Sequence, residues 1–283
     1  MTPPPLELRA GRLRLALCPA LGGSIAGLWW GDVPVLRSTE AAGLKAARLS
    51  GCYPLVPYSN RVGYRRFSWQ GQDHTTAANF DDNPHSVHGV AWLRPWTVTA
   101  SSAAVAELAY THEADAHWPF GFHARQKFVL TLDALEVHLS VTNLAATTQP
   151  VGLGWHPYFP KRDHSHLNIQ VSGRWDNDAS GLPTHRVSQA GIDDSVASLA
   201  FDNCFDGWQG PALVRDEKLA LTLTASVPYL VVFTPDNKPY YCVEPVSHVS
   251  NAVQMADPPA HGLLALAPQA ACEVWMKLAV TTA

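Results

Sequence analysis

Three ionisable side chains, far apart in the chain, each lie among Gly, Pro and aromatic residues. Glu244 follows the apolar, aromatic run 240–242, which predicts a strand, so its carboxylate is expected where that strand ends. His88 lies in Pro-His-Ser-Val-His-Gly, and His156 lies in Gly-Trp-His-Pro-Tyr-Phe. One carboxylate and two histidines are the groups that general acid–base chemistry uses near neutral pH. The alternative is that each histidine is a buried, hydrogen-bonded core residue without a catalytic role.

Two further polar residues could bind a ligand. Arg61 lies in Pro-Tyr-Ser-Asn-Arg-Val-Gly, where its guanidinium could hold ligand oxygens; otherwise it is an exposed surface arginine. Asp202 lies between aromatic residues, where it is either a turn cap or an acceptor for a ligand hydroxyl. The chain also has ten Trp, eight Tyr and nine Phe. Flat aromatic rings match the apolar C–H faces of sugars, although most such rings serve as core or surface cover.

The remaining histidines and the cysteines do not predict a metal site. His164 and His166 form a His-x-His pair, and His85 and His88 could also be ligands, but neither pair supplies the number of ligands that a zinc site needs. His138 is expected on the polar face of a strand, at the surface. The cysteines are odd in number, widely spaced and without a CxxC pair, which favours reduced thiols in the core: Cys18, Cys52, Cys204, Cys242 and Cys272.

Apolar residues recur at every second position through much of the chain, which predicts β-strands that position these groups. Residues 128–132 and 135–141 both alternate in this way, and the short link between them predicts a hairpin. The same alternation occurs at 12–17, 219–223 and 274–280. With 22 prolines and 19 glycines supplying turns, the pattern predicts an all-β sandwich or barrel.

Two segments depart from this pattern. Residues 39–47 could form a short helix, and residues 174–205 are polar and irregular, which predicts a long ordered loop system. No repeat, low-complexity tract or linker composition interrupts the chain, so residues 1–283 are expected to form a single domain.

Composition narrows the class of protein. The net charge is −4 and the few basic residues are scattered, so clustered Lys and Arg for nucleic-acid binding are missing. The N-terminal sequence lacks the basic and apolar regions of a signal peptide, and no apolar run is long enough to span a membrane. These features favour a cytoplasmic protein. The sequence leaves open whether it is a monomer or a homodimer.

Several segments, in order and at long spacings, resemble the aldose 1-epimerase (galactose mutarotase) family. The resemblance spans roughly residues 13–280 and implies a large antiparallel β-sandwich with few short helices and an open sugar-binding cleft. The segments that carry it are Pro57–Arg61, Arg66–Gly71, His85–Gly89, Trp92–Trp96, Gly154–Phe159, Asp202–Phe205 and Cys242–Ser247.

The resemblance also implies an activity, the interconversion of the α and β anomers of a free hexose or pentose without a cofactor. Glu244 is then the base and His156 the acid, and their mutual attraction is expected to favour an ionised Glu244 and a protonated His156. His88 is expected to donate a hydrogen bond near the ring oxygen. The residues expected to contact sugar hydroxyls are Asn60, Arg61 and Asp202.

One departure from the family pattern concerns the last of these residues. Phe201 stands where a Leu is expected before the aspartate, so Asp206, four residues later, is a second candidate.

Three alternatives remain at this stage. A phosphorylated or sulfonated sugar would need a local cationic cluster, for which Arg65 and Arg66 lie close to Arg61 in the sequence. A non-catalytic carbohydrate-binding module would need the cleft but not both proton-transfer groups. A metal-dependent β-barrel hydrolase or oxygenase would need converging histidines and a carboxylate, and no metal is expected here.

Overall fold

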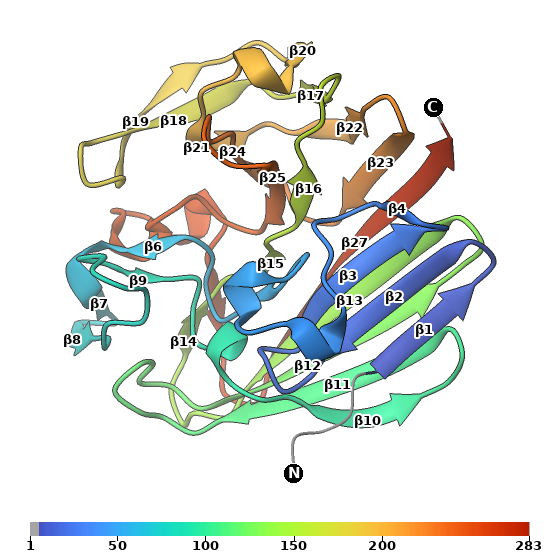
Figure 1. Cartoon of the computed structure of the whole chain (residues 1–283). Helices are drawn as coiled ribbons and strands as arrows, with labels where there is room; N and C mark the ends of the chain where they lie inside the picture. Colours follow the sequence, from blue (N-terminus) through green and yellow to red (C-terminus); the bar gives the residue numbers. More distant parts are fainter. Residues whose placement is uncertain (1–5, 283) are drawn as a thin grey trace.

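A computed structural model describes residues 6–282 and consists mainly of antiparallel strands (Figure 1). The largest sheet has nine strands, in the spatial order β10 (Thr97–Ser101), β11 (Val105–His112), β12 (Phe122–Leu130), β13 (Ala134–Asn143), β27 (Ala271–Thr282), β23 (Leu219–Ala225), β22 (Gln209–Arg215), β17 (His166–Gln170) and β20 (Ile192–Ser195). The second has eight, in the order β19 (Pro183–Ser188), β18 (Gly173–Asn177), β21 (Asp202–Asp206), β24 (Tyr229–Phe233), β25 (Tyr240–Val246), β15 (Gly154–Trp155) and β5 (Pro54–Leu55), with β16 (Tyr158–Pro160) also paired to β25.

Smaller sheets complete the fold. A four-stranded sheet contains β1 (Leu6–Ala10), β2 (Leu13–Cys18), β3 (Ser24–Trp30) and β4 (Val33–Pro34). Three two-stranded ribbons pair β6 (Arg61–Val62) with β9 (Ser86–Val87), β7 (Arg66–Trp69) with β8 (Gln72–Thr75), and β14 (Gln149–Val151) with β26 (Leu264–Leu266). Within residues 6–282, helical structure is limited to single 3₁₀ turns: η1 (Ala41–Gly43), η2 (Ala47–Leu49), η3 (Gly63–Arg65), η4 (Ala91–Leu93), η5 (Val196–Ser198), η6 (Ala252–Gln254) and η7 (Pro259–His261).

Period-two alternation explains how the strands form the main core. The apolar positions of β13 are buried while the intervening side chains are partly exposed, as predicted. The predicted hairpin is also confirmed, because β12 pairs with β13 in antiparallel register, with Leu130 opposite Leu135. Leu139 and Leu221 of the nine-stranded sheet belong to the same hydrophobic cluster as Val243 of the eight-stranded sheet. The main core therefore unites the two large sheets, which confirms the all-β fold.

The eight-stranded sheet carries different chemistry on its two faces. On β25, Tyr241 and Val243 join the main core, whereas Cys242 belongs to a second apolar cluster. Successive side chains of a strand point to opposite faces, so Glu244 shares the face of Cys242. The same rule places Asp202 of β21 opposite the neighbouring Asn203, on the face of Cys204, which also belongs to the second cluster. The sheet thus presents its carboxylates away from the main core.

Three local predictions are wrong. Residues 174–205 form β18, β19, β20 and the start of β21 rather than a loop system, because short strands with exposed faces lack apolar alternation. Residues 39–47 overlap two 3₁₀ turns instead of a helix, and neither turn has a side-chain cap. Glu244 lies inside β25 rather than at its end, because the strand continues through Pro245, which pairs opposite Leu230.

No helix in the described range is long and apolar enough to cross a membrane.

Candidate active site

A cavity of about 270 Å³ opens on the carboxylate-bearing face of the eight-stranded sheet. Its volume is below the roughly 300–1,000 Å³ typical of pockets for drug-sized ligands, so it suits a single small ring. All six residues expected to form a sugar site line it: Asn60, Arg61, His88, His156, Asp202 and Glu244. The remaining lining residues are mainly aromatic: Tyr53, Phe80, Asn83, Val87, Tyr158, Phe233 and Tyr240.

Glu244 and His156 form a buried pair at the base of this cavity. The Oε1 atom of Glu244 lies 3.3 Å from Nε2 of His156. Glu244 is only 2% exposed and His156 only 7%. Oε2 of Glu244 and Nδ1 of His156 are buried without a hydrogen-bond partner among the described residues. Buried polar atoms are nearly always paired in folded proteins, so two unpartnered atoms in one buried pair mark this site as unusual.

Burial sets the protonation of this pair in a way that the sequence does not reveal. It raises the pKa of Glu244 well above its ordinary value, and the nearby Asp202 raises it further. Burial lowers the pKa of His156 well below its ordinary value, with His88 and Arg37 adding to the effect. Burial thus opposes the expected ionised Glu244 and protonated His156. It favours the arrangement with the same single proton in which a neutral carboxylic acid lies beside a neutral imidazole.

His88 is held by a strained loop that fixes its hydrogen bonding. Its backbone lies in the left-handed region, at φ 64°, which is uncommon for any residue but Gly. The backbone N–H of Asn60 donates to His88 Nδ1 at 3.1 Å, and the N–H of His88 donates to the Asn60 carbonyl at 2.8 Å. Burial lowers the pKa of His88 to about 3. His88 is therefore a neutral imidazole whose proton is on Nε2, ready to donate into the cavity.

The ring of His156 lies in a stack of aromatic groups that only partly follows from sequence motifs. Tyr53 and Tyr158 stack on it, with ring centroids 4.9 Å and 4.4 Å away. The guanidinium of Arg37 lies 3.6 Å from the centroid of Tyr158. The backbone N–H of His156 donates to the Tyr53 carbonyl at 3.0 Å. Sequence analysis missed Tyr53 and Arg37, because neither belongs to a segment with a polar motif.

Arg61 links the loop that bears it to the opposite side of the cavity. It donates to Oδ1 of Asn60 at 3.0 Å and to Oδ2 of Asp202 at 3.2 Å. The β18–β19 turn packs on it so closely that a Cβ at Gly181 would lie 2.9 Å from its Cζ. This hairpin, which the sequence did not predict, thus holds the guanidinium toward Asp202.

Asp206, the second candidate for a sugar contact, lies outside the cavity lining. Arg186 donates to both of its carboxylate oxygens at 2.7 Å, and Trp175 Nε1 donates to it at 3.0 Å. The carboxylate of Asp202 contacts only Arg61 among the described residues, and its side chain is 46% exposed. The arrangement favours Asp202 as the residue that meets a ligand.

His248 supports the loop that carries Asn60 and Arg61, although no motif singled it out. The backbone N–H of Ser59 donates to His248 Nε2 at 3.0 Å, and its Nδ1 lies 2.7 Å from the Val249 carbonyl. Nδ1 must then carry the proton and Nε2 must be bare, so the ring is neutral. Burial lowers the pKa of His248 to about 4.

The two buried neutral histidines, His88 and His248, make stability depend on pH. An unfolded histidine titrates near 6.5, so below that pH the unfolded chain binds protons that the folded chain does not. The free energy of unfolding should therefore fall as pH drops from 6 to 5, by about 1 kcal/mol for each of these histidines. His156 adds to this loss, and Glu244 opposes it because its raised pKa gives the folded chain the extra proton.

Urea denaturation at pH 7, 6 and 5 measures this effect. We expect a progressively lower midpoint on acidification, and a shallower decline in His248→Gln, where one titrating group is removed. A midpoint that stays constant from pH 7 to pH 5 would contradict the protonation states assigned to both residues.

The groups considered for other functions do not converge on the cavity. Arg65 and Arg66 are exposed, and Arg66 lines a different hollow. Both ring nitrogens of His85 are engaged, one by the Tyr64 N–H and the other beside the Ser180 carbonyl. His166 lies 3.6 Å from Asp193 on β20. None of these groups lines the cavity around Glu244.

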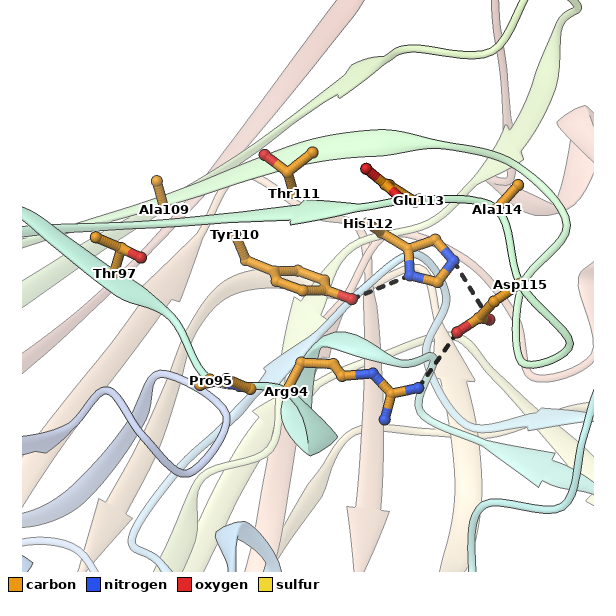
Figure 2. Close-up of a pocket in the computed structure, with 10 residues that line it drawn as sticks. All are labelled: Arg94, Pro95, Thr97, Ala109, Tyr110, Thr111, His112, Glu113, Ala114 and Asp115. Carbon is orange, nitrogen blue, oxygen red and sulfur yellow. Dashed lines mark hydrogen bonds and ion pairs between the residues drawn. The ribbon is translucent and has the colours of Figure 1, made fainter. Parts of the chain in front are cut away.

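A larger hollow of about 730 Å³ lies between β10, β11 and the loop after β11, and four of its polar side chains contact one another: Arg94, Tyr110, His112 and Asp115 (Figure 2). The Tyr110 hydroxyl lies 3.0 Å from His112 Nδ1, and His112 Nε2 lies 3.0 Å from the Trp118 carbonyl. Asp115 contacts both His112 and Arg94. No residue of this hollow lines the other cavity. His112, at the end of β11, thus contacts Asp115 and Trp118 within the β11–β12 connection, which indicates a structural role.

Comparisons with known proteins agree with the fold and identify the family. The chain is 33% identical over 264 residues to the uncharacterized Escherichia coli K12 protein YphB, covering 87% of this chain and 89% of that protein. A candidate aldose 1-epimerase from Escherichia coli K12 has a crystal structure that matches with a TM-score of 0.89 and 31% identity, over 99% of each chain. A galactose mutarotase-like protein from Clostridium acetobutylicum matches in fold, with a TM-score of 0.85 and 21% identity, over 98% of this chain and 95% of that one. Residues 4–278 match the family model described as aldose 1-epimerase, so the chain belongs to the aldose 1-epimerase family.

Proposed function

We propose that the protein, acting as one catalytic domain, is a mutarotase that interconverts the α and β anomers of a free aldose. The observation that supports this most strongly is the buried Glu244–His156 pair, 3.3 Å apart, at a cavity sized for one ring. Anomer interconversion must move protons at two oxygens bonded to the same carbon. An acid and a base within hydrogen-bonding distance of each other can serve two such neighbouring oxygens.

The proposed reaction opens and recloses the sugar ring. The carboxylate of Glu244 takes the proton from the anomeric hydroxyl as the bond between C1 and the ring oxygen breaks. His156 gives its proton to that ring oxygen, which leaves an open-chain aldehyde and a neutral hydroxyl. Rotation about the C1–C2 bond exposes the other face of the aldehyde, and the same two groups then run in reverse. Protons balance over the cycle, so no cofactor is required.

The reaction needs the pair as Glu244 carboxylate and His156 imidazolium, whereas burial favours the two neutral forms. These two arrangements hold the same single proton. A bound sugar can stabilise the charged arrangement through the unpartnered Oε2 of Glu244 and Nδ1 of His156. The charged arrangement thus forms when the proton moves from Glu244 to His156, without uptake of a proton from solvent. His88 supports the step by donating from Nε2 to the charge that develops on the ring oxygen.

Two observations favour a free sugar and an enzyme over the alternatives. Among the described residues that line the cavity, Arg61 is the only Lys or Arg, and Asp202 already neutralises it. A phosphate or sulfonate would need a further cation. A binding module has no use for a buried acid–base pair with unpartnered atoms, whose burial costs stability.

Asp202→Asn should weaken sugar binding with little effect on the chemical step. Loss of one hydrogen bond to a charged group costs about 1.5–3 kcal/mol, so KM should rise about 10–100-fold while kcat changes little. Asp206→Asn is the matched control: it breaks the contacts to Arg186 and Trp175, so it should lower the melting temperature without raising KM. If instead Asp206→Asn raises KM and Asp202→Asn does not, the roles of the two aspartates are exchanged.

Polarimetry tests the proposed function directly. Freshly dissolved α-anomers of free and phosphorylated aldoses are followed as their optical rotation relaxes to equilibrium. We expect the protein to accelerate this relaxation for at least one free hexose or pentose. Acceleration confined to phosphorylated sugars would contradict the proposed substrate class. Sugar binding detected by calorimetry without any acceleration would indicate a binding module.

A further inference from the structure

A third side chain that could bind a metal ion lies beside the Glu244–His156 pair, behind the cavity wall. Cys242 is two residues before Glu244 on β25, so both side chains project from the same face of the sheet. A sulfur of Cys242, an oxygen of Glu244 and a nitrogen of His156 all lie within 4.8 Å of one another. All three residues are buried. Across residues 6–282, this is the only group of three or more such residues close enough to hold a metal ion.

The spacing of these atoms fits tetrahedral zinc. Zinc binds nitrogen and oxygen at about 2.0–2.2 Å, so two such ligands at a tetrahedral centre are about 3.3–3.6 Å apart. The 3.3 Å between His156 Nε2 and Glu244 Oε1 already matches this edge. A zinc–sulfur bond of about 2.3 Å requires the thiol of Cys242 to move inward by at most roughly 1.3 Å. Glu244 and His156 are thus already spaced for a zinc ion, and only the side chain of Cys242 must move.

Charge and access also favour a zinc ion. A thiolate and a carboxylate together neutralise its two positive charges, which a buried site requires. Imidazole and thiolate ligands favour zinc, whereas magnesium and calcium favour oxygen ligands. His156 and Glu244 line the cavity, so the ion has an entry path and its fourth position faces the open volume. Three protein ligands with one open position is a recurring zinc arrangement.

We propose that Cys242, His156 and Glu244 form a zinc-binding site that excludes the sugar and inhibits the enzyme. The zinc ion occupies both the acid and the base. The proton of the Cys242 thiol and the one proton of the Glu244–His156 pair both leave to solvent as the zinc–sulfur and zinc–oxygen bonds form. Binding of zinc is independent of the proposed function, whereas the inhibition rests on it. The ion is an inhibitor and not a cofactor, because the ring-opening step needs both residues free.

Equilibrium dialysis of chelator-treated protein against zinc chloride tests the site without any activity measurement. The wild type should bind one zinc ion per chain that Cys242→Ala does not bind. Loss of an outer-shell partner alone weakens metal binding by up to about 100-fold, so removal of this ligand should exceed that. Cys204→Ala is the matched control, because it removes an equally buried thiol of the same apolar cluster and should bind zinc like the wild type. Melting temperatures of both variants establish that each is folded.

In the dialysis experiment, two outcomes overturn the proposal: a wild type that binds no zinc, or a folded Cys242→Ala that binds zinc as tightly as the wild type. In polarimetry, zinc should slow the wild type and Cys204→Ala but not Cys242→Ala. A protein that binds zinc through Cys242 yet has no mutarotase activity would retain the metal site and refute the proposed function, so the two failures are distinguishable. Equal inhibition of all three proteins would instead place inhibitory zinc elsewhere and contradict the proposal.

Discussion

Glu244→Gln should lower kcat for anomer interconversion by about 10²–10⁴-fold, the contribution typical of a positioned general base. The amide has nearly the same shape as the carboxylic acid, so the cavity should keep its form. It cannot accept the proton of the anomeric hydroxyl, which is the step assigned to Glu244. KM should change little, because the hydroxyl contacts through Arg61 and Asp202 are retained. Polarimetry at saturating sugar measures the effect.

Glu244→Gln should keep the native fold, for the same physical reason that the pKa of Glu244 is raised. Burial of Glu244 raises its pKa and favours its neutral form, so a neutral amide should be at least as stable in that position. A melting temperature close to that of the wild type is therefore expected. Glu273→Gln, an exposed carboxylate beside His138, is the control and should keep full activity. If Glu244→Gln is folded and retains near-wild-type kcat, another residue must be the base.

His156→Asn should produce a loss of similar size, about 10²–10⁴-fold in kcat, because the ring oxygen no longer receives a proton. The substitution also removes a ring that packs against both Tyr53 and Tyr158, so a decrease in melting temperature is expected. Calorimetric titration with sugar separates this loss of stability from the loss of chemistry. His138→Asn, on the exposed face of β13, is the matched control and should be fully active.

The double variant is informative because Glu244 and His156 act as a unit. Once one member is lost, the other has no partner to complete the proton transfer. The kcat of Glu244→Gln/His156→Asn should therefore be close to that of the less active single variant. It should not be reduced by the product of the two single fold-losses. Multiplicative losses would indicate that the two residues act in separate steps.

Much of the fold follows from local pattern. In β13, each alternate apolar residue is buried, because one face of the strand meets the core and the other meets solvent. The β18–β19 hairpin could not be predicted in this way, because nearly all of its strand residues are partly or fully exposed and no alternation marks its strands. That hairpin nonetheless places Gly181 against Arg61. Edge strands of this kind depend on their partners rather than on their own sequence.

The residues of the site likewise include some that the sequence could predict and some that it could not. Residues in distinctive segments, such as His88 and His156, could be selected from the sequence. Arg37 could not, because its part in the site is a stack on Tyr158 that only the folded chain creates. The raised pKa of Glu244 could not be predicted either, since the sequence shows a carboxylate and a histidine but not how deeply they are buried. Cys242 belonged to an apolar strand run, and its position beside Glu244 depends on that strand continuing through Pro245.

Magnetisation-exchange NMR of an aldose already at anomeric equilibrium measures the proposed reaction most directly. In deuterated water, the H1 signals of the α and β anomers should exchange at a rate proportional to enzyme concentration, while C2 keeps its hydrogen because only C1 and the ring oxygen react. No exchange above the spontaneous rate, across free aldoses that the protein binds, would contradict the account. Deuterium appearing at C2 would contradict it as well, because the chemistry would then lie at a different carbon.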